Sequence, residues 1–459
     1  MFSRLIKRFF GGDVAPQAAD ATAAFVDLNR SAPLRGPAPP AANPRPSEAP
    51  ATFLCREAVL GRDQRIAGYQ FMLREAGHQR VQQRSRRVAH LCAEVLVADL
   101  VRADVGRLLG PRLAFIEVPD SFLDHPSLQT LPARQTVLLP RPHADVGAPD
   151  LTGVFDQCRR LQGHGFRIAL PDPLVVTDYA GFLAHANLLW MEGSGLEVAH
   201  DQQLRQLLQT LKATPPALLV RGLDTLDHFR YCFNGGVRYF QGPFVTSRES
   251  WEAGVLSPNV TRITALIARL RGDAPTEEIT ALIKQDAALS MRLLRYINSA
   301  AVALPEKVSS IERALLLVGR DKLYRWLILL AYGADEVEGR AAAALETALV
   351  RARMLELLGG DRPPRERESL FLVGLLSLAD VILQVPLDKA LAPLGLDPDI
   401  DAVLRGGDGP WRGLLDLAVA CERSDGESLE AVAARCGIAP EAASACHLDA
   451  LNWATELQS

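Results

Sequence analysis

The sequence predicts an α/β barrel followed by an all-helical domain. From about residue 52 to 250, short apolar runs alternate with helix-length segments and no sequence repeat is present. After about residue 254 the strand-like runs stop and apolar residues recur at helical spacing. Alternating strands and helices are typical of an α/β barrel or a doubly wound sheet. Eight candidate strands favour the barrel.

Residues 1–51 precede both domains and lack any periodic apolar spacing. The first ten, MFSRLIKRFF, mix cations with aromatic and aliphatic residues, and the rest is rich in Ala, Pro, Gly and Ser. This composition predicts a disordered, partly polyproline tail. The segment is not expected to be a signal peptide, because cations interrupt its apolar stretch. A short helix on a membrane surface remains the alternative to a frayed terminus.

The barrel elements can be placed in order. The candidate strands are 52–60, 67–73, 112–118, 135–139, 166–170, 188–191, 217–220 and 237–240. Residues 85–103 and 155–165 have the length and spacing of helices between them. The turn signal Gly61-Arg62-Asp63 separates the first two strands. We therefore expect a hairpin there rather than a strand–helix–strand unit, so that the barrel begins irregularly.

The second half carries helix-start signals in succession. Ser257 precedes Pro258 as an N-cap before a first-turn proline, and residues 275–278 (PTEE) open another helix with acidic residues near its positive end. Ser309 and Glu312 fit a capping box. Further helical patterns span 338–358, 367–384, 410–423, 427–436 and 440–456. We expect a barrel over 52–253, a helical domain over 254–459 and, since the link is short, a fixed interface between them.

Composition restricts the function classes. The chain has 459 residues, 48% of them hydrophobic and 23% charged, with a net charge of -4. No apolar run approaches the ~18 residues that cross a bilayer. No broad basic surface is indicated, so nucleic acid is not an expected partner. The seven cysteines form no C-x-x-C pair and are expected to be buried thiols in a reducing compartment. We expect a cytoplasmic protein.

Several segments match known families. The first domain resembles the EAL family of cyclic-di-GMP phosphodiesterases, and the second resembles the HDOD domain. The EAL resemblance rests on GRDQRIAGYQFMLRE (61–75), FIEVPDSFL (115–123), GFRIALPDP (165–173), LLVRGLDT (218–225) and YFQGPFV (239–245). The HDOD resemblance rests on residues 283–330 and on FLVGLLSLADVILQVPL (371–387). Together they imply a (β/α)8-like EAL barrel followed by an all-helical HDOD domain in a bacterial signalling protein.

The EAL resemblance also identifies positions where charged site residues are replaced. Such phosphodiesterases hold divalent cations with carboxylate and amide oxygens at strand ends. In this chain the positions expected to carry carboxylates or a lysine are occupied by Gln70, Leu139, Pro171, Trp190 and Arg221. Polar residues remain at Glu117, Asp172, Glu192, Asp224 and Gln241. We expect no catalytic residues, no bound metal and no cofactor.

Binding of cyclic-di-GMP without hydrolysis is the alternative for the barrel. Arg74 matches the arginine that follows the signature motif and could bind a phosphate or a guanine edge. The helical domain offers no imidazole metal site, because His447 is the only histidine after residue 228. The HDOD resemblance implies a noncatalytic module for protein association.

The sequence therefore predicts a noncatalytic signalling protein that acts through protein–protein contacts. Its partners are expected to be other signalling proteins, and a homodimer through the EAL-like domain is possible. In the helical domain we expect Asn298 to close a helix end and Trp326 to pack in the core or at the domain interface.

Overall fold

The computed structural model describes residues 52–75, 86–142, 151–172, 185–193, 204–205, 209, 216–249, 251, 254–298, 308–332, 338–422 and 429–458. The tail predicted over residues 1–51 lies outside this part of the chain. No helix within the described ranges is long and apolar enough to cross a bilayer.

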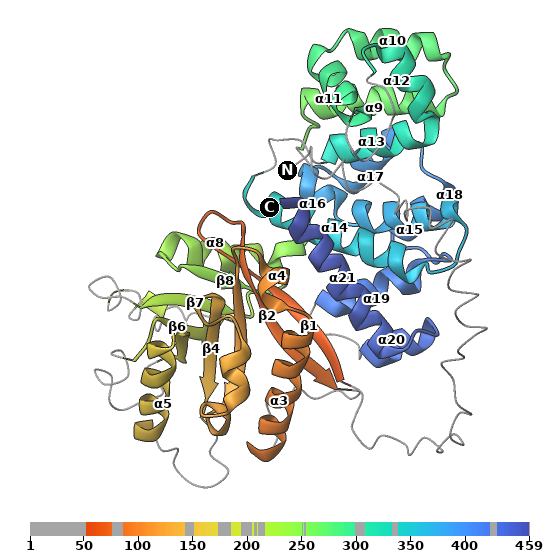
Figure 1. Cartoon of the computed structure of the whole chain (residues 1–459). Helices are drawn as coiled ribbons and strands as arrows, with labels where there is room; N and C mark the ends of the chain where they lie inside the picture. Colours follow the sequence, from red (N-terminus) through yellow and green to blue (C-terminus); the bar gives the residue numbers. More distant parts are fainter. Residues whose placement is uncertain are drawn as a thin grey trace, which may run out of the picture.

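The first half is a closed barrel of eight strands in sequence order (Figure 1). The strands are β1 (Thr52–Leu60), β2 (Ile66–Glu75), β3 (Leu113–Pro119), β4 (Thr136–Arg141), β5 (Arg167–Pro171), β6 (Leu188–Glu192), β7 (Ala217–Arg221) and β8 (Tyr239–Gln241). Strand β1 runs antiparallel to both of its neighbours, β2 and β8, whereas the other pairs are parallel. The predicted barrel and its irregular hairpin start are confirmed.

Side chains from alternate strand positions fill the barrel interior, as the period of two in a strand requires. This inner cluster consists of Val59, Phe115, Val137, Leu139, Ala169, Leu188, Trp190 and Leu219. Outside the strands lie α3 (Arg86–Arg102), α4 (Val105–Leu109), α5 (Leu151–Gly163) and α8 (Leu226–Gly235). The interior is therefore a packed core, and ligand chemistry is confined to the strand ends.

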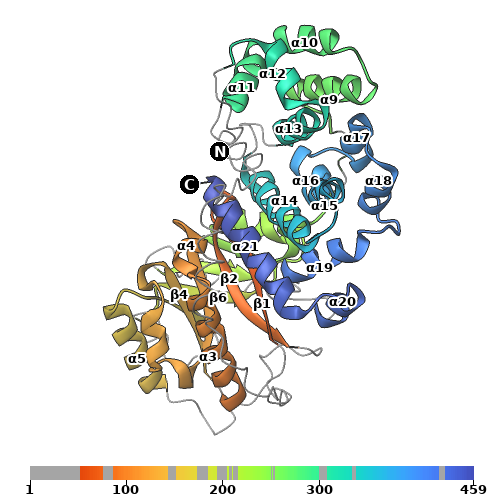
Figure 2. The same ribbon diagram turned by 45° about the vertical axis from the view of Figure 1, so that its right-hand side comes forward.

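The second half is helical, in agreement with the prediction. Its helices are α9 (Pro258–Arg271), α10 (Thr276–Lys284), α11 (Ala287–Ile297), α12 (Ile311–Val318), α13 (Arg320–Tyr332), α14 (Gly339–Leu358), α15 (Pro364–Leu376), α16 (Ala379–Leu383), α17 (Leu387–Leu391), α18 (Pro398–Leu404), α19 (Arg412–Glu422), α20 (Leu429–Arg435) and α21 (Pro440–Gln458). Helices α9 to α12 lie farthest from the barrel, and α14 and α21 lie next to it (Figures 1 and 2).

Helix α14 is the central element of this half and is buried along most of its length. Helix α15 packs closely on it, because at Gly374 a Cβ atom would come within 2.4 Å of the Ala352 Cα. The fully buried Trp326 stacks on Tyr296, so it belongs to the core as expected. Asn298 ends α11 and exchanges hydrogen bonds with the backbone of Val308, which confirms its structural role.

Two helix predictions differ from the structure. The N-cap of α12 is Ser310, whose hydroxyl accepts from the Arg313 amide, and Glu312 pairs with Lys284 instead of closing a box with Ser309. The predicted capping box of Ser309 and Glu312 is therefore wrong by one residue. Either of the two adjacent serines could cap the helix from the sequence alone, and it is Ser310 that has the extended backbone of an N-cap. The pattern at 367–384 also divides into α15 and α16, because the backbone leaves the helix at Leu378.

Buried polar contacts join the two halves at the outer face of the β1–β2 hairpin. Glu346 on α14 accepts a hydrogen bond from the Tyr69 hydroxyl and lies 2.6 Å and 2.7 Å from two nitrogens of Arg112. The Arg56 guanidinium carbon lies over the aromatic ring of Tyr69, 4.4 Å from the ring centroid. Because these side chains are nearly inaccessible to solvent, they fix α14 against β2.

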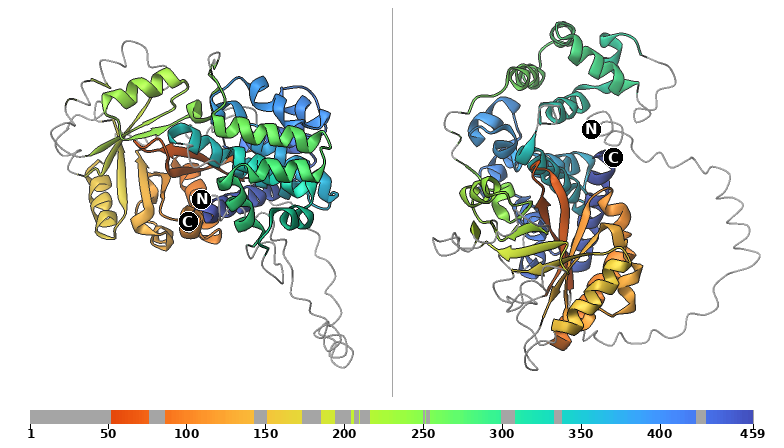
Figure 3. Two further views of the ribbon diagram at one scale, coloured as in Figure 1. Left: turned by 90° about the horizontal axis from the view of Figure 1, so that it is seen from above. Right: turned by 90° about the vertical axis from the view of Figure 1, so that its left-hand side faces the viewer.

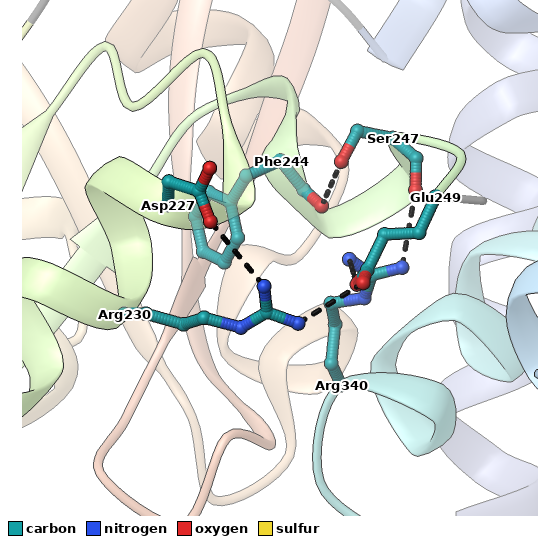
Figure 4. A network of polar contacts seen from close by, with 6 residues as sticks. All are labelled: Asp227, Arg230, Phe244, Ser247, Glu249 and Arg340. Carbon is teal, nitrogen blue, oxygen red and sulfur yellow. Dashed lines mark hydrogen bonds and ion pairs between the residues drawn. The ribbon is translucent and has the colours of Figure 1, made fainter. Parts of the chain in front are cut away.

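A second set of contacts ties the segment after β8 to the start of α14 (Figure 4). Arg340 donates to the Ser247 carbonyl at 3.0 Å and to Glu249 at 3.3 Å. Arg230 of α8 lies 3.0 Å from the other oxygen of Glu249 and also pairs with Asp227. One carboxylate thus links a barrel helix to the helical half, consistent with the short connection between them, and the view from above shows both halves side by side (Figure 3).

Candidate functional site

The candidate site lies where the parallel strands end at their carboxyl termini, the usual position of sites in α/β barrels. Glu117 is near the end of β3, and Glu192, Arg221 and Gln241 are the last residues of β6, β7 and β8. Pro171 ends β5 and is followed by Asp172. The topology therefore gathers residues that are up to 124 positions apart in sequence at one rim, which we call the barrel mouth.

A buried guanidinium is the centre of this mouth. Arg221 Nη1 donates to Glu117 Oε2 at 3.0 Å, and its Nε lies 3.9 Å from Glu192 Oε1. Glu117 Oε1 in turn lies 2.6 Å from Arg141 Nε. Burial lowers the pKa of Arg221, but the nearby carboxylates, first Glu117 and then Glu192, outweigh it and raise that pKa overall. The guanidinium is therefore permanently charged and held by two strands.

An indole ring lies against this ion-pair network. The guanidinium carbons of Arg221 and Arg141 are 4.8 Å and 5.6 Å from the centroid of the Trp190 ring. Trp190 is 7% exposed and also belongs to the inner apolar cluster together with the fully buried Leu139. An aromatic face stabilises adjacent cations, so Trp190 supports the same guanidinium that the carboxylates hold.

Gln70 on β2 and Gln241 on β8 flank β1, the strand that closes the barrel between them. Gln241 Nε2 donates to Glu57 Oε2 at 2.8 Å, and Glu57 is paired in register with Gln70. The Oε1 atoms of Gln70 and Gln241 are buried without a hydrogen-bond partner among the described residues. The residue that follows Gln241 has to be a glycine, because a Cβ atom at Gly242 would lie 2.3 Å from the Leu223 carbonyl oxygen.

The remaining predicted positions are less central. Asp172 is 7% exposed, whereas Asp224 is exposed in the segment after β7. Arg74 lies on β2 opposite Phe53, and its side chain falls outside the described part of the structure. Thus the structure brings Glu117, Glu192, Arg221 and Trp190 into contact, and the role predicted for Arg74 stays a prediction.

Two residues of the mouth were missed from the sequence. Arg141 follows Leu139 by two positions at the end of β4, and Glu57 precedes Val59 by two positions in β1. Leu139 and Val59 both belong to the inner cluster. The period of two along a strand would have assigned Arg141 and Glu57 to the same inward face as these neighbours.

The residues at the mouth do not fit a divalent cation. Both oxygens of Glu117 are engaged by guanidinium groups, and Arg221 adds a fixed positive charge beside Glu192. Pro171 and Leu139 have no side-chain oxygen to offer. Within the described residues, no group of three or more His, Cys, Asp or Glu side chains is arranged to hold a metal ion.

The comparisons with known proteins agree with the architecture. Residues 255–394 match the model of the HDOD domain. Over 410 residues, 88% of this chain, the sequence is 23% identical to the cyclic di-GMP phosphodiesterase CdgJ of Vibrio cholerae and covers 93% of it. It is 20% identical over the same length to YuxH of Bacillus subtilis, of which it covers 98%.

Solved EAL structures also align with part of the chain. An EAL protein of Vibrio cholerae in its c-di-GMP bound form matches 43% of this chain and 91% of its own, at 13% identity and a TM-score of 0.35. YkuI of Bacillus subtilis, with c-di-GMP and calcium, matches 52% of this chain and 72% of its own, at 13% identity and a TM-score of 0.36. The closed barrel and the HDOD match confirm the predicted order of an EAL-like barrel and an HDOD domain.

Proposed function

We propose that this chain, an EAL-like barrel joined to an HDOD domain, is a signalling protein related to cyclic-di-GMP that does not hydrolyse this dinucleotide and acts through contacts with other proteins. The name of the relative CdgJ supports the relation to cyclic-di-GMP. The observation that supports loss of hydrolysis is the Arg221 guanidinium, which lies between Glu117 and Glu192 at the barrel mouth.

The argument against hydrolysis is electrostatic. Metal-assisted phosphodiester hydrolysis needs cations that lower the pKa of a water and stabilise the developing charge. At the mouth the guanidinium groups of Arg221 and Arg141 already pair with the carboxylates of Glu117 and Glu192, and a divalent cation would have to displace a guanidinium from a buried ion pair. The Trp190 ring replaces the lysine expected there, which removes a phosphate-binding charge. No step of hydrolysis can be assigned to the residues that remain.

We also propose the organisation expected from the sequence: a barrel over 52–253, a helical HDOD domain over 254–459 and a cytoplasmic location. Both Glu249 and Arg248 contact residues of the helical half, through Arg340 and Asp380 respectively. The segment after β8 therefore joins the halves structurally, which supports a boundary shortly after residue 249.

A hydrolysis assay tests the main proposal. The purified full chain is incubated with cyclic-di-GMP in Mg²⁺ and separately in Mn²⁺, and products are separated by chromatography. We expect no linear dinucleotide, while an active EAL phosphodiesterase produces it in the same buffers. Metal-dependent turnover that persists in an independently purified sample would contradict the proposal.

A receptor that binds cyclic-di-GMP without cutting it is the second candidate. The observation that favours it is Trp190, whose ring is flanked by two guanidinium groups, with Arg141 28% exposed and able to meet a phosphate or a base edge. Such an aromatic and cationic surface suits a nucleotide.

Calorimetric titration distinguishes the two candidates. We expect the parent protein to show no binding of cyclic-di-GMP, with or without divalent cations. Micromolar binding that is lost in Arg141→Ala and in Arg74→Ala would establish the receptor instead. Arg134→Ala is the matched control, because Arg134 is exposed near the opposite end of β4.

Exposed apolar side chains in the HDOD region support the proposed protein contacts. Met291 on α11 and Leu316 and Leu317 on α12 are 56%, 76% and 46% exposed. If a partner covers them, Leu316→Glu should abolish its co-purification with the tagged full chain from the native cell. Val255→Glu, at an 83% exposed residue before α9, should not. Equal recovery with both variants would argue against a contact through α12.

A further inference from the structure

A buried guanidinium on the outer face of β1 has no hydrogen-bonded partner in the part of the chain that the structure describes. Arg56 is 4% exposed and lies over the Tyr69 ring. Its Nε and Nη2 atoms are buried without a hydrogen-bond partner among the described residues, and no described carboxylate forms an ion pair with it. Arginines are almost never fully buried unless they are paired, because an uncompensated charge in a protein interior is strongly destabilising. The surroundings of Arg56 therefore favour a negative charge.

His447 on α21 is a second buried group of this kind at the same interface. It is 1% exposed, and neither of its ring nitrogens has a hydrogen-bond partner among the described residues. Helix α21 packs on β1 (Figure 2), and after burial the positive charge of Arg56 is the cause that lowers the pKa of His447. The two side chains therefore face the same part of the interface and present N–H donors to it from both halves of the molecule.

The carboxylate that α14 brings to this interface is already engaged. Glu346 Oε1 accepts from the Tyr69 hydroxyl and lies 2.6 Å from Arg112 Nη1, and Glu346 Oε2 accepts from Arg112 Nη2 at 2.7 Å. Burial keeps both Tyr69 and His447 uncharged near neutral pH, since it raises the first pKa and lowers the second. With Arg112 balanced by Glu346, these side chains carry one positive charge in excess, that of Arg56. A monovalent anion would balance it.

Short side chains flank His447 on the buried face of α21. Ala443 lies about one turn before it and Ala450 about one turn after it, and both are fully buried. Methyl groups cover less of the imidazole edge than longer side chains would. A site enclosed in this way suits a monatomic ion, which is small and needs no particular orientation, better than a nucleotide or an organic acid.

We propose that the interface between β1 and α21 binds a small monovalent anion of the halide class, which accepts hydrogen bonds from Arg56 and from His447. The ion balances the guanidinium charge and gives both side chains a common partner. Because its donors come from the barrel and from the helical half, the ion holds the two halves together and binds only while α21 is packed on β1. It therefore stabilises the folded chain by mass action.

Thermal unfolding of the full chain at constant ionic strength tests this proposal, with chloride as the probe and gluconate, which is too large for the site, in its place. For a dissociation constant of about 5 mM, raising chloride from about 5 to about 300 mM should increase the ratio of folded to unfolded protein about thirtyfold. Arg56→Met should lose this dependence. Arg362→Met, at an exposed arginine, should keep it. Equal stability of the parent protein in chloride and gluconate, or an equal chloride response in Arg56→Met, overturns the proposal.

The line width of the chloride NMR signal measures binding directly, because chloride that exchanges with a protein site has a broadened signal. We expect the parent protein to broaden the signal and bromide to reverse the effect by competition, whereas gluconate should not. Arg56→Met and His447→Leu should lose the broadening while circular dichroism shows that they are folded. If Arg56→Met does not fold, the bromide competition on the parent protein decides. No broadening that bromide reverses, or full broadening in a folded Arg56→Met, overturns the proposal.

Discussion

At the scale of single residues, Arg221 shows how one buried guanidinium organises the barrel mouth as an ion-pair network. Its side chain is 7% exposed and its partner Glu117 is 17% exposed, so both charges depend on each other for compensation. Removing one member of such a pair is costly because the other remains buried and charged. Replacing the cation with a neutral side chain therefore affects stability before it can affect any ligand.

We predict that Arg221→Met lowers the free energy of unfolding by about 3 kcal/mol. This value is at the low end of the range measured when one member of a buried ion pair is removed, because Glu117 keeps its ion pair with Arg141. Arg362→Met, which breaks an exposed pair with Glu366, should cost about 0.5 kcal/mol or less. Urea denaturation of both variants measures the difference, and equal losses would mean that Arg221 is not held as the structure indicates.

His447 leads to a prediction about pH. It lies buried on α21; burial first, and then the positive charge of Arg56, lower its pKa well below the usual 6.5. The unfolded chain binds a proton near pH 6.5 and the folded chain does not, so stability falls as the pH drops below that value. The expected slope is about 1.4 kcal/mol per pH unit.

Thermal or urea denaturation at several pH values between about 5 and 7.5 checks this linkage. His447→Leu removes the titrating group and should flatten this part of the profile. His164→Leu, at an exposed position after α5, should keep the slope of the parent protein. If the His447 variant and the parent show the same slope, another group causes the acid sensitivity.

At the scale of elements, the start of α12 illustrates how helix ends are selected. Two adjacent serines precede the helix, and the hydroxyl of Ser310 satisfies the Arg313 amide. Ser310→Ala should therefore cost about 1 kcal/mol, the usual value of an N-cap, whereas Ser309→Ala should change stability little. Denaturant unfolding of the two variants measures this difference, and a larger effect at Ser309 would restore the original capping-box prediction.

Helix α14 shows why amphipathic pattern is a poor guide to some elements. It is buried around most of its circumference, since α15 and α21 pack on it and it faces the barrel through Glu346. A helix enclosed in this way needs no polar face, and its buried charged residues are all paired. Arg340 pairs with Glu249, Glu346 with Arg112, and Arg351 with Glu422. Its buried charges therefore mark the interfaces rather than the solvent.

At the scale of the whole molecule, the two polar contact sets make the barrel and the helical half one structural unit. Arg340 and Glu346 are six positions apart on α14 and contact opposite ends of the barrel sequence, the segment after β8 and strand β2. Tyr69 faces Glu346, and the next residue, Gln70, belongs to the other face of β2. A displacement of α14 would therefore move β2, the strand that carries Gln70.

We predict that the full chain unfolds in one calorimetric transition and that Glu346→Gln lowers the free energy of unfolding by about 3 kcal/mol, because Arg112 would keep a buried charge without its carboxylate. Glu366→Gln, at an exposed residue, should have little effect. Separate transitions for the two halves of the parent protein would contradict the coupling. A Glu346 variant as stable as the parent would show that the contact is not required.

The sequence by itself determined the type and order of the elements. A continuous apolar run such as the one in β3 and helical spacing such as that of α9 are local features of the chain, so they can be interpreted without knowledge of the neighbouring elements. The hairpin of β1 and β2, the N-cap at Ser257 and the role of Asn298 were predictable for the same reason. The replacement of charged residues by Leu139 and Trp190, which the EAL resemblance implies, stays a prediction.

Tertiary structure alone decided which charges compensate each other. The sequence placed Arg221, Glu117 and Glu192 on a site but could not show that they form one ion-pair network, nor that Arg141 completes it, because these residues meet only when β3, β4, β6 and β7 close into the barrel. The same holds for Tyr69 and Glu346, which are 277 residues apart. Long-range electrostatic pairing depends on distance in space, which local sequence patterns do not encode.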